Sequence, residues 1–191
     1  MDTSNTKAQA LNTKLQKDGK DLLEKSNIIN LLKEFGDVTI GGSYVYGTMV
    51  DEDIDVDVIV KNGEITFTLR DQVMNALLKI DGLDGIAMSD RFHFPSKYYG
   101  IWFGPKVWHD NKKWNINIWI VYGDEPNTYQ NNELHQKMLK ITEAQRSTML
   151  NIKYQALRAG TKDKGITSSL IYNAVIDKGV STYADFIKLQ A

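Results

Sequence analysis

The sequence contains no cysteine, which excludes disulfide bonds, thiolate metal sites and cysteine nucleophiles. It has no apolar run long enough to span a bilayer, and segment 1–19 is too polar for a signal peptide. Only 4 residues are arginine against 19 lysines, and the net charge is −1, which argues against a dedicated nucleic-acid-binding protein. We therefore expect a cytoplasmic protein that does not bind membranes and whose main partner is not a nucleic acid.

The 191 residues are enough for one hydrophobic core with a helical extension, and their 42% apolar and 25% charged content is ordinary for a folded protein. Apolar residues at helical spacing predict a helix over 20–35, which Gly36 ends. Segment 61–64 carries a hairpin signal that would pair 65–68 with 53–60. The other expected strands are 37–40, 85–88, 92–94, 98–103 and 113–122; the other expected helices are 68–80, 131–157, 166–176 and 182–189, the last capped by Ser181.

This pattern predicts an α/β (α+β) protein in which a core with strands is followed by helices. We divide the chain into an N-terminal helical segment, 1–36, a core, 37–126, and a C-terminal helical region, 127–191. The tryptophans gather in the core and are expected to fill it or to cover the sheet, with a place in an acceptor pocket as the alternative. They are Trp102, Trp108, Trp114 and Trp119.

A glycine pair and a serine, Gly41-Gly42-Ser43, directly follow the short apolar strand 38–40. Glycine lets the backbone turn sharply and approach a ligand closely. Ser43 then offers a hydroxyl and an amide beside an expected helix N-terminus, which suits an anion. These three residues are therefore candidates for binding the phosphates of a nucleotide.

Acidic and β-branched residues alternate in Asp53-Ile54-Asp55-Val56-Asp57. Because side chains on a strand alternate between its faces, the three carboxylates share one face. Neighbouring carboxylates repel one another unless a cation lies between them, and oxygen ligands of this kind suit Mg²⁺ or Mn²⁺. The sequence therefore predicts a metal site close to a phosphate-binding turn.

Two other interpretations of the acidic strand are open. Asp53, Asp55, Asp57 and Glu64 match the spacing of a calcium EF-hand loop, but Val58 stands where that loop requires glycine. The second interpretation is an acidic surface strand after an ordinary turn.

Gly42-Ser43, nine intervening residues and Asp53-x-Asp55 resemble the signature of the polymerase-β-type nucleotidyltransferases, above all the small bacterial minimal and lincosamide- or aminoglycoside-type members. The resemblance covers about twenty residues and identifies the superfamily better than the substrate. It implies a mixed, mostly antiparallel sheet with flanking helices. It also implies that Ser43 contacts a triphosphate and that Asp53 and Asp55 hold two Mg²⁺ ions.

The family places a third carboxylate on a later apolar strand, where it completes a metal site and often acts as general base. The corresponding stretch, 114–120, has asparagines on the expected face, and Asn117 is the preferred counterpart because it lies nearer the middle of the apolar run than Asn115. An amide carries no charge and accepts no proton at neutral pH. Substitute acids are Glu64, Asp110 and Asp124.

Two functions follow. The first is transfer of a nucleoside monophosphate, expected to be AMP from ATP, to a hydroxyl of a small molecule or protein, with Asp53, Asp55 and Asn117 as catalytic residues. The second is a nucleotide-binding sensor or partner protein without turnover. A nucleoside triphosphate and an unknown acceptor are the expected partners, and a homodimer is left open. His93 and His109 lack metal-ligand spacing, and each is expected to be a surface or hydrogen-bonded residue rather than a metal ligand.

Overall fold

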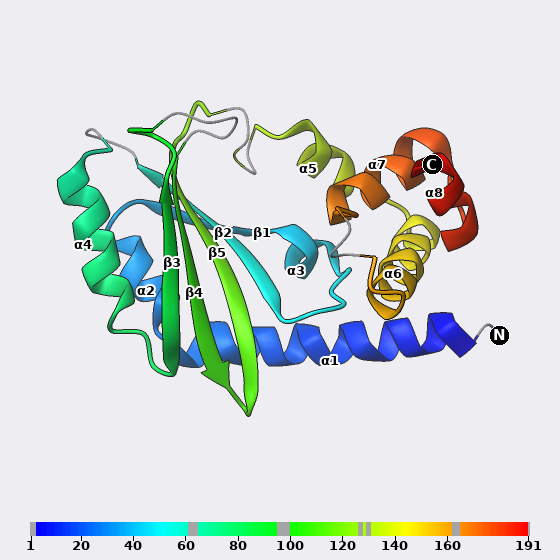
Figure 1. Ribbon diagram of the computed structural model, residues 1–191, viewed down its shortest axis with the longest axis horizontal. Helices are drawn as coiled ribbons and strands as arrows, with labels where there is room; N and C mark the ends of the chain where they lie inside the picture. The colour runs from blue at the N-terminus through cyan, green and yellow to red at the C-terminus, as the bar shows by residue number, and fades with distance from the viewer. Residues whose placement is uncertain are drawn as a thin grey trace.

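The computed structural model describes residues 3–60, 65–94, 100–125, 128, 131–161 and 165–190. It confirms a mixed α/β fold in which one five-stranded sheet is flanked by helices (Figure 1). The strands are β1 (Asp37–Gly41), β2 (Asp53–Val60), β3 (Leu83–Asp90), β4 (Ile101–His109) and β5 (Lys112–Tyr122). The helices are α1 (Thr3–Lys25), α2 (Ile28–Lys33), α3 (Gly42–Tyr46), α4 (Phe67–Leu77), α5 (Glu133–Met138), α6 (Glu143–Arg158), α7 (Ser168–Lys178) and α8 (Tyr183–Gln190).

The strand order in the sheet is β1-β2-β5-β4-β3. Among the described strands, only β2 and β5 run parallel to each other, and the other neighbouring pairs are antiparallel. The sheet is therefore mixed and mostly antiparallel. The parallel pair matters most for function because it places β5 directly beside the acidic strand.

One face of the sheet carries the larger hydrophobic core. Ile54, Val56 and Val58 of β2 are fully buried there, next to the alternating isoleucines of β5. Helices α1, α2 and α4 supply the apolar side chains that cover this face. Since alternate strand residues point to opposite faces, burial of this apolar set leaves the acidic set of β2 on the other face.

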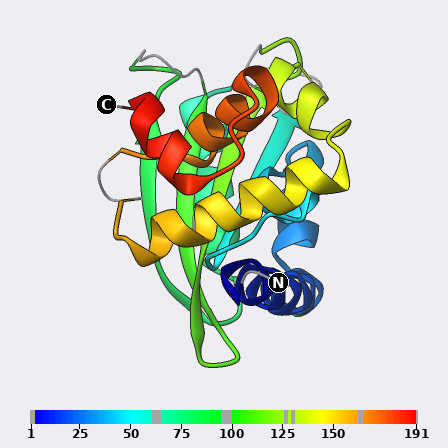
Figure 2. The same ribbon diagram turned by 90° about the vertical axis from the view of Figure 1, so that its right-hand side faces the viewer.

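The C-terminal helices form a second cluster of buried residues on α5, α6, α7 and α8, which Tyr46 of α3 joins. Helix α6 crosses α1 and also packs on α7 (Figure 2). Among the described helices, none combines the length and apolar character needed to cross a membrane.

Several predicted boundaries were wrong. The strand over 65–68 does not form, because the Thr66 side chain accepts a hydrogen bond from the Leu69 amide at 3.1 Å and caps α4; the hairpin turn 61–64 lies outside the described residues. Segment 92–94 is a turn that the Asp90 carboxylate holds through the amides of Phe92 and His93. Of the strand expected over 98–103, the structure describes β4 from Ile101, and β4 continues to His109.

The predicted helices also differ at their ends. The helix expected over 20–35 is interrupted, because Asn27 has a φ of +58° and separates α1 from α2. Helix α1 is continuous from Thr3 to Lys25, with Ala8, Leu15 and Leu22 buried along its length. Helix α2 ends at Lys33, before the predicted cap Gly36. The helix expected over 131–157 is two helices, since Thr142 forms a capping box with Gln145 and starts α6 anew.

The last helix is capped differently from the prediction. Thr182 rather than Ser181 provides the side-chain oxygen, which accepts a hydrogen bond from the Asp185 amide at 3.1 Å. The Thr182 hydroxyl in turn donates to the Asp185 carboxylate at 2.7 Å. This reciprocal pairing fixes the start of α8.

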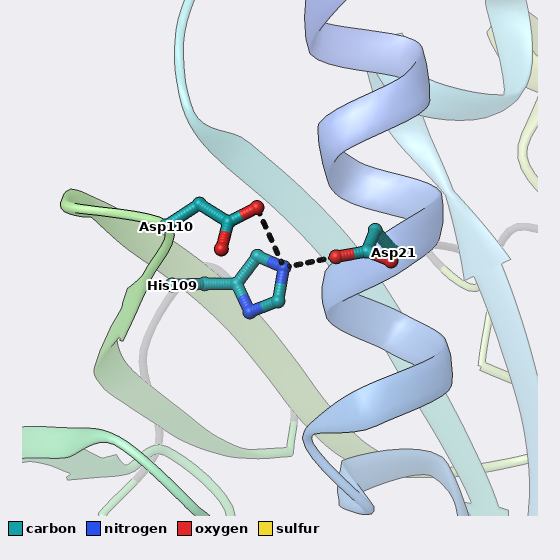
Figure 3. A group of neighbouring side chains, drawn as sticks. All are labelled: Asp21, His109 and Asp110. Atoms are coloured by element: carbon teal, nitrogen blue, oxygen red, sulfur yellow. Dashed lines mark hydrogen bonds and ion pairs between the residues drawn. The ribbon is translucent and has the colours of Figure 1, made fainter.

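The β4–β5 hairpin is tied to α1 through His109 (Figure 3). The Nε2 atom of His109 lies 2.7 Å from a carboxylate oxygen of Asp21 and 3.9 Å from one of Asp110. Lys25, one turn along α1, also donates a hydrogen bond to Asp21 at 2.9 Å. The hydrogen bond from Lys25 is the main cause, and the one with His109 the second, of a lowered pKa for the Asp21 carboxyl. Because Asp21 already has these partners, we assign this group a structural role. His109 and His93 are both hydrogen-bonded, as expected.

Candidate functional site

The three aspartates of β2 lie beside the polar residues of β5. In the parallel ladder Asp53 is opposite Asn115, Asp55 opposite Asn117, and Asp57 opposite Trp119. Asp57 is buried, whereas Asp53 and Asp55 are partly exposed. The acidic face of β2 therefore continues onto β5, and two of its carboxylates are accessible.

Asn117 contacts both accessible carboxylates. Its Nδ2 atom donates to Oδ1 of Asp53 at 3.0 Å and to Oδ1 of Asp55 at 3.2 Å. Its Oδ1 atom accepts a hydrogen bond from Nε1 of Trp102 at 3.3 Å. The amide therefore turns its donor end toward the two acids. Asn115 is exposed.

The glycine turn packs directly on the acidic strand. Gly42 has a φ of +62°, and a Cβ atom built on it would lie 1.9 Å from Oδ2 of Asp55. Gly41, in an extended conformation, ends β1, and the buried Ser43 lies in the first turn of α3. Gly47 ends α3, also at positive φ. Only glycine can occupy position 42 without moving the carboxylate of Asp55.

Replacing Gly42 by valine should therefore disturb the site in two ways. A β-branched side chain at positive φ is strained, and its Cβ would collide with Asp55. We expect a loss of about 2 kcal/mol or more in the free energy of unfolding, together with loss of nucleotide binding. Denaturant unfolding and calorimetry measure the two effects. Gly85→Val is the matched control, because a Cβ on Gly85 meets no atom within 4 Å. Undiminished nucleotide affinity in Gly42→Val would contradict the assignment of this turn to phosphate binding.

A pocket of about 550 Å³ opens over the aspartates, between the sheet and the C-terminal helices. One wall comes from β2, α3 and β5, and the other from α5, α7 and the segments before them. The sheet-side residues are Gly42, Ser43, Tyr46, Asp51, Asp53, Asp55, Asp57, Trp119 and Val121. The remaining lining residues are Glu125, Thr128, Asn132, Leu134, His135, Ile166, Thr167, Ser168, Ser169 and Tyr172.

Hydrogen bonds join the two walls of this pocket. The Tyr46 hydroxyl lies 2.8 Å from Nδ1 of His135, and burial raises the pKa of Tyr46 and lowers that of His135. The Tyr172 hydroxyl lies 2.8 Å from the Thr48 hydroxyl and accepts a hydrogen bond from Nζ of Lys153 at 3.1 Å. A buried polar network thus fixes the helices relative to the acidic strand.

The pKa of Asp53 is strongly perturbed. Burial is the main cause, and the charge of Asp55 adds to it, so that the pKa of Asp53 rises to about 7. The positive charge of Lys153 and the hydrogen bond from Asn117 act in the opposite direction. Without a cation, therefore, this carboxyl takes up a proton near neutral pH.

The stability of the metal-free protein should consequently depend on pH. The folded chain holds the Asp53 proton up to about pH 7, whereas an ordinary aspartate loses it near 3.8. The stabilisation that this proton gives the folded state is complete below about pH 3.8, and it is lost as the pH rises through about 7. Denaturant unfolding in EDTA should show a free energy of unfolding that falls by a few kcal/mol between pH 5 and pH 8, since one pKa unit corresponds to about 1.4 kcal/mol. Asp53→Asn should lack this component, and parallel pH profiles for the two proteins would contradict it.

The residues present fit a divalent cation at two positions. Asp53 and Asp55 offer carboxylate oxygens from one strand face, which is the ligand type that Mg²⁺ and Mn²⁺ prefer. The third position, Asn117, offers N–H groups that cannot coordinate a metal. The site therefore offers two accessible carboxylates to a cation, and position 117 supplies no third anionic ligand.

The structure brings most of the sequence-predicted residues together. Gly42, Ser43, Asp53 and Asp55 line the pocket, and Asn117 contacts both acids. Of the proposed substitute acids, Asp110 and Asp124 are not among the pocket residues, and Glu64 lies outside the described chain. Outside β2, the carboxylates that line the pocket are Asp51 and Glu125.

Sequence reasoning missed the polar network and the hydrogen bond from Trp102 to Asn117. For Lys153 a signal existed, because a lysine stands on the buried face of α6 with Met149, Ile152 and Ala156. A charged residue within an apolar helical stripe is expected to have a buried partner. Tyr46 and Tyr172 gave no such signal, since aromatic residues on a helix are ordinary core residues.

Comparison with known proteins identifies the fold. No protein-family model matches the chain, and no curated protein matches it in sequence. Among solved structures, the Cid1 poly(U) polymerase in a complex with Mg²⁺ and 3′-dATP aligns with a TM-score of 0.54 and 16% identity, over 76% of this chain and 42% of that one. A chain of the noncanonical poly(A) polymerase complex GLD-2–GLD-3 aligns with a TM-score of 0.61 and 14% identity, over 92% of this chain and 58% of that one.

The present chain shares the fold of these two polymerase structures. It spans about half the length of the two polymerase chains. At these identities the likeness concerns the fold, and any activity has to be argued from the site.

Proposed function

We propose that this protein binds a nucleoside triphosphate with a divalent cation and transfers its nucleoside monophosphate to a hydroxyl group. The observation that carries the proposal is the contact of Gly42 with Asp55 at the floor of the pocket. It sets a tight glycine turn with its serine directly against Asp55, one of two accessible carboxylates on the same strand face. A fold shared with nucleotidyltransferases supports the same conclusion.

Each residue has a defined role in this proposal. Gly41, Gly42 and Ser43 receive the phosphates through backbone amides and the Ser43 hydroxyl. Asp53 and Asp55 hold the cation, which when bound neutralises charge on the triphosphate. The C-terminal helices, through the wall that includes His135 and Tyr172, enclose the nucleotide and exclude water.

The acceptor proton needs a base, and Asn117 cannot serve. Loss of a general base commonly lowers a rate by about 10²- to 10⁴-fold. Glu125 is the pocket carboxylate we assign to this role. A second function, nucleotide binding without turnover, is favoured by one observation: the amide of Asn117, where the resemblance leads us to expect an acid, turns its donor end to Asp53 and Asp55.

Thermal unfolding with each nucleoside triphosphate, with and without Mg²⁺ or Mn²⁺, tests the binding step. Release of pyrophosphate with hydroxyl acceptors, among them an oligonucleotide because the two similar proteins are polynucleotide polymerases, tests transfer. Stabilisation with pyrophosphate release supports the enzyme. Stabilisation without release under any acceptor supports the sensor, and no stabilisation by any nucleotide contradicts both.

Several narrower expectations belong to this proposal. They are the similarity to small bacterial antibiotic-type enzymes, ATP as the donor, a cytoplasmic location and the division of the chain at residues 36 and 126. Each follows from the sequence pattern or from the resemblance.

A further inference from the structure

Trp102 lies across strand β4 in a conformation that depends on a glycine. In the ladder Trp102 is opposite Trp119, and it therefore shares the sheet face of the β2 aspartates. A Cβ atom built on Gly104 would lie 2.5 Å from Cζ2 and 2.6 Å from Cη2 of the indole. The bare backbone of Gly104 thus lets the ring lie flat along the strand, with its N–H directed at Asn117.

The two ends of the Asn117 amide are not equivalent in this setting. An indole nitrogen can only donate, so the amide end that faces Trp102 has to be the acceptor, Oδ1. The other end, Nδ2, then faces the carboxylates of Asp53 and Asp55. Rotating the amide by half a turn would bring its N–H groups against the N–H of Trp102, so that two donors face each other. The same rotation would bring the amide oxygen against the carboxylates of Asp53 and Asp55.

We propose that Trp102 is a positioning residue that keeps the donor end of Asn117 on the metal site, so that an entering cation has to compete with the amide. This inference rests on the proposed function in one respect, the assignment of Asp53 and Asp55 as metal ligands. In the absence of metal the amide N–H groups relieve the repulsion between the two acids. To offer its oxygen to a cation, Asn117 has to give up the hydrogen bond from Trp102.

Removing the indole N–H should therefore tighten cation binding. Trp102→Phe keeps an aromatic ring over Gly104 but has no donor, so the amide is free to turn its oxygen toward the metal. Because one intramolecular hydrogen bond contributes about 0.5–1.5 kcal/mol, we expect the affinity for Mn²⁺ to rise roughly two- to tenfold.

The test is a titration of the metal-free protein with Mn²⁺ alone. Binding is measured by calorimetry and, independently, by the electron paramagnetic resonance signal of the free ion. Trp108→Phe is the matched control: Trp108 is also on β4, and its Nε1 donates to a side-chain oxygen of Asp84 on β3 at 3.1 Å, outside the pocket. Its affinity for Mn²⁺ should equal that of the wild type. In an Asn117→Ala background, Trp102→Phe should bring no gain, because no amide remains to be oriented.

Tighter binding by Trp102→Phe, absent from Trp108→Phe and lost in the Asn117→Ala background, supports the proposal. Unchanged or weaker binding by Trp102→Phe overturns it while leaving the metal site of Asp53 and Asp55 intact. A gain that persists with Asn117→Ala also overturns it, since Trp102 would then act by another route. If neither the wild type nor Trp102→Phe binds Mn²⁺, the inference and the proposed function fall together.

Discussion

Asp53→Asn and Asp55→Asn should each abolish the Mg²⁺-dependent binding of ATP while leaving the protein folded. Each change removes one of the two accessible carboxylates that Asn117 bridges, and with it half of the charge available to a cation. Asn keeps the size of the side chain, so the contact of Gly42 with position 55 is preserved. Calorimetric titration of ATP with Mg²⁺ measures the loss, which we expect to be at least a hundredfold in affinity.

The same variants should behave in the opposite way without metal. At pH 8 Asp53 is ionised although burial and Asp55 disfavour its charge. Removing this charge should therefore raise the free energy of unfolding, and each kcal/mol gained should raise the melting temperature by about 2–4 °C. Asp84→Asn is a control, because this acid pairs with Lys113 on the exposed surface of the sheet. Asp84→Asn should change neither the affinity for ATP with Mg²⁺ nor the melting temperature of the metal-free protein. Wild-type ATP affinity in both Asp53→Asn and Asp55→Asn would place the nucleotide elsewhere.

The elements that form the floor of the site were predictable because their signals are local. The acidic strand alternates polar and apolar residues, and that alternation alone decides which side chains enter the core. The glycine turn follows an apolar strand directly, and the need for glycine at position 42 appears in the structure as a contact with Asp55. The preference for Asn117 over Asn115 rested on its place in an apolar strand, and its contacts with the acids depend on the parallel pairing of β2 with β5.

The rest of the site depends on packing between distant parts of the chain. Lys153 reaches Tyr172 and, through it, Thr48, which precedes Lys153 by more than a hundred residues. No local pattern specifies how α6 and α7 meet the sheet. The wrong strand over 65–68 has a different cause: its residues alternate like a strand, but the Thr66 cap and the apolar spacing that continues through Val73 and Leu77 favour a helix.

Asn117→Asp should change stability and metal binding in opposite directions. One oxygen of the new carboxylate can still accept the hydrogen bond from Trp102, and the other would face Asp53 and Asp55 in place of a donor. The metal-free protein should therefore be less stable at pH 8, because three carboxylates meet without a cation. With metal the same charge is favourable, and two unit charges 4 Å apart interact by about 4 kcal/mol at an effective dielectric constant of 20. We expect the affinity for Mg²⁺ to rise by at least about tenfold.

The measurement is the melting temperature at pH 8 against Mg²⁺ concentration for the wild type, Asn117→Asp and Asn115→Asp. Asn115 is the matched control, since it lies on the same strand two residues away but is exposed. Asn117→Asp should start lower and rise further than the other two. If the protein is a transferase that lacks only its third acid, pyrophosphate release should also increase, within the roughly 10²- to 10⁴-fold range of a general base. Equal Mg²⁺ responses in the three proteins would show that position 117 does not belong to the metal site, whatever its contacts with Asp53 and Asp55.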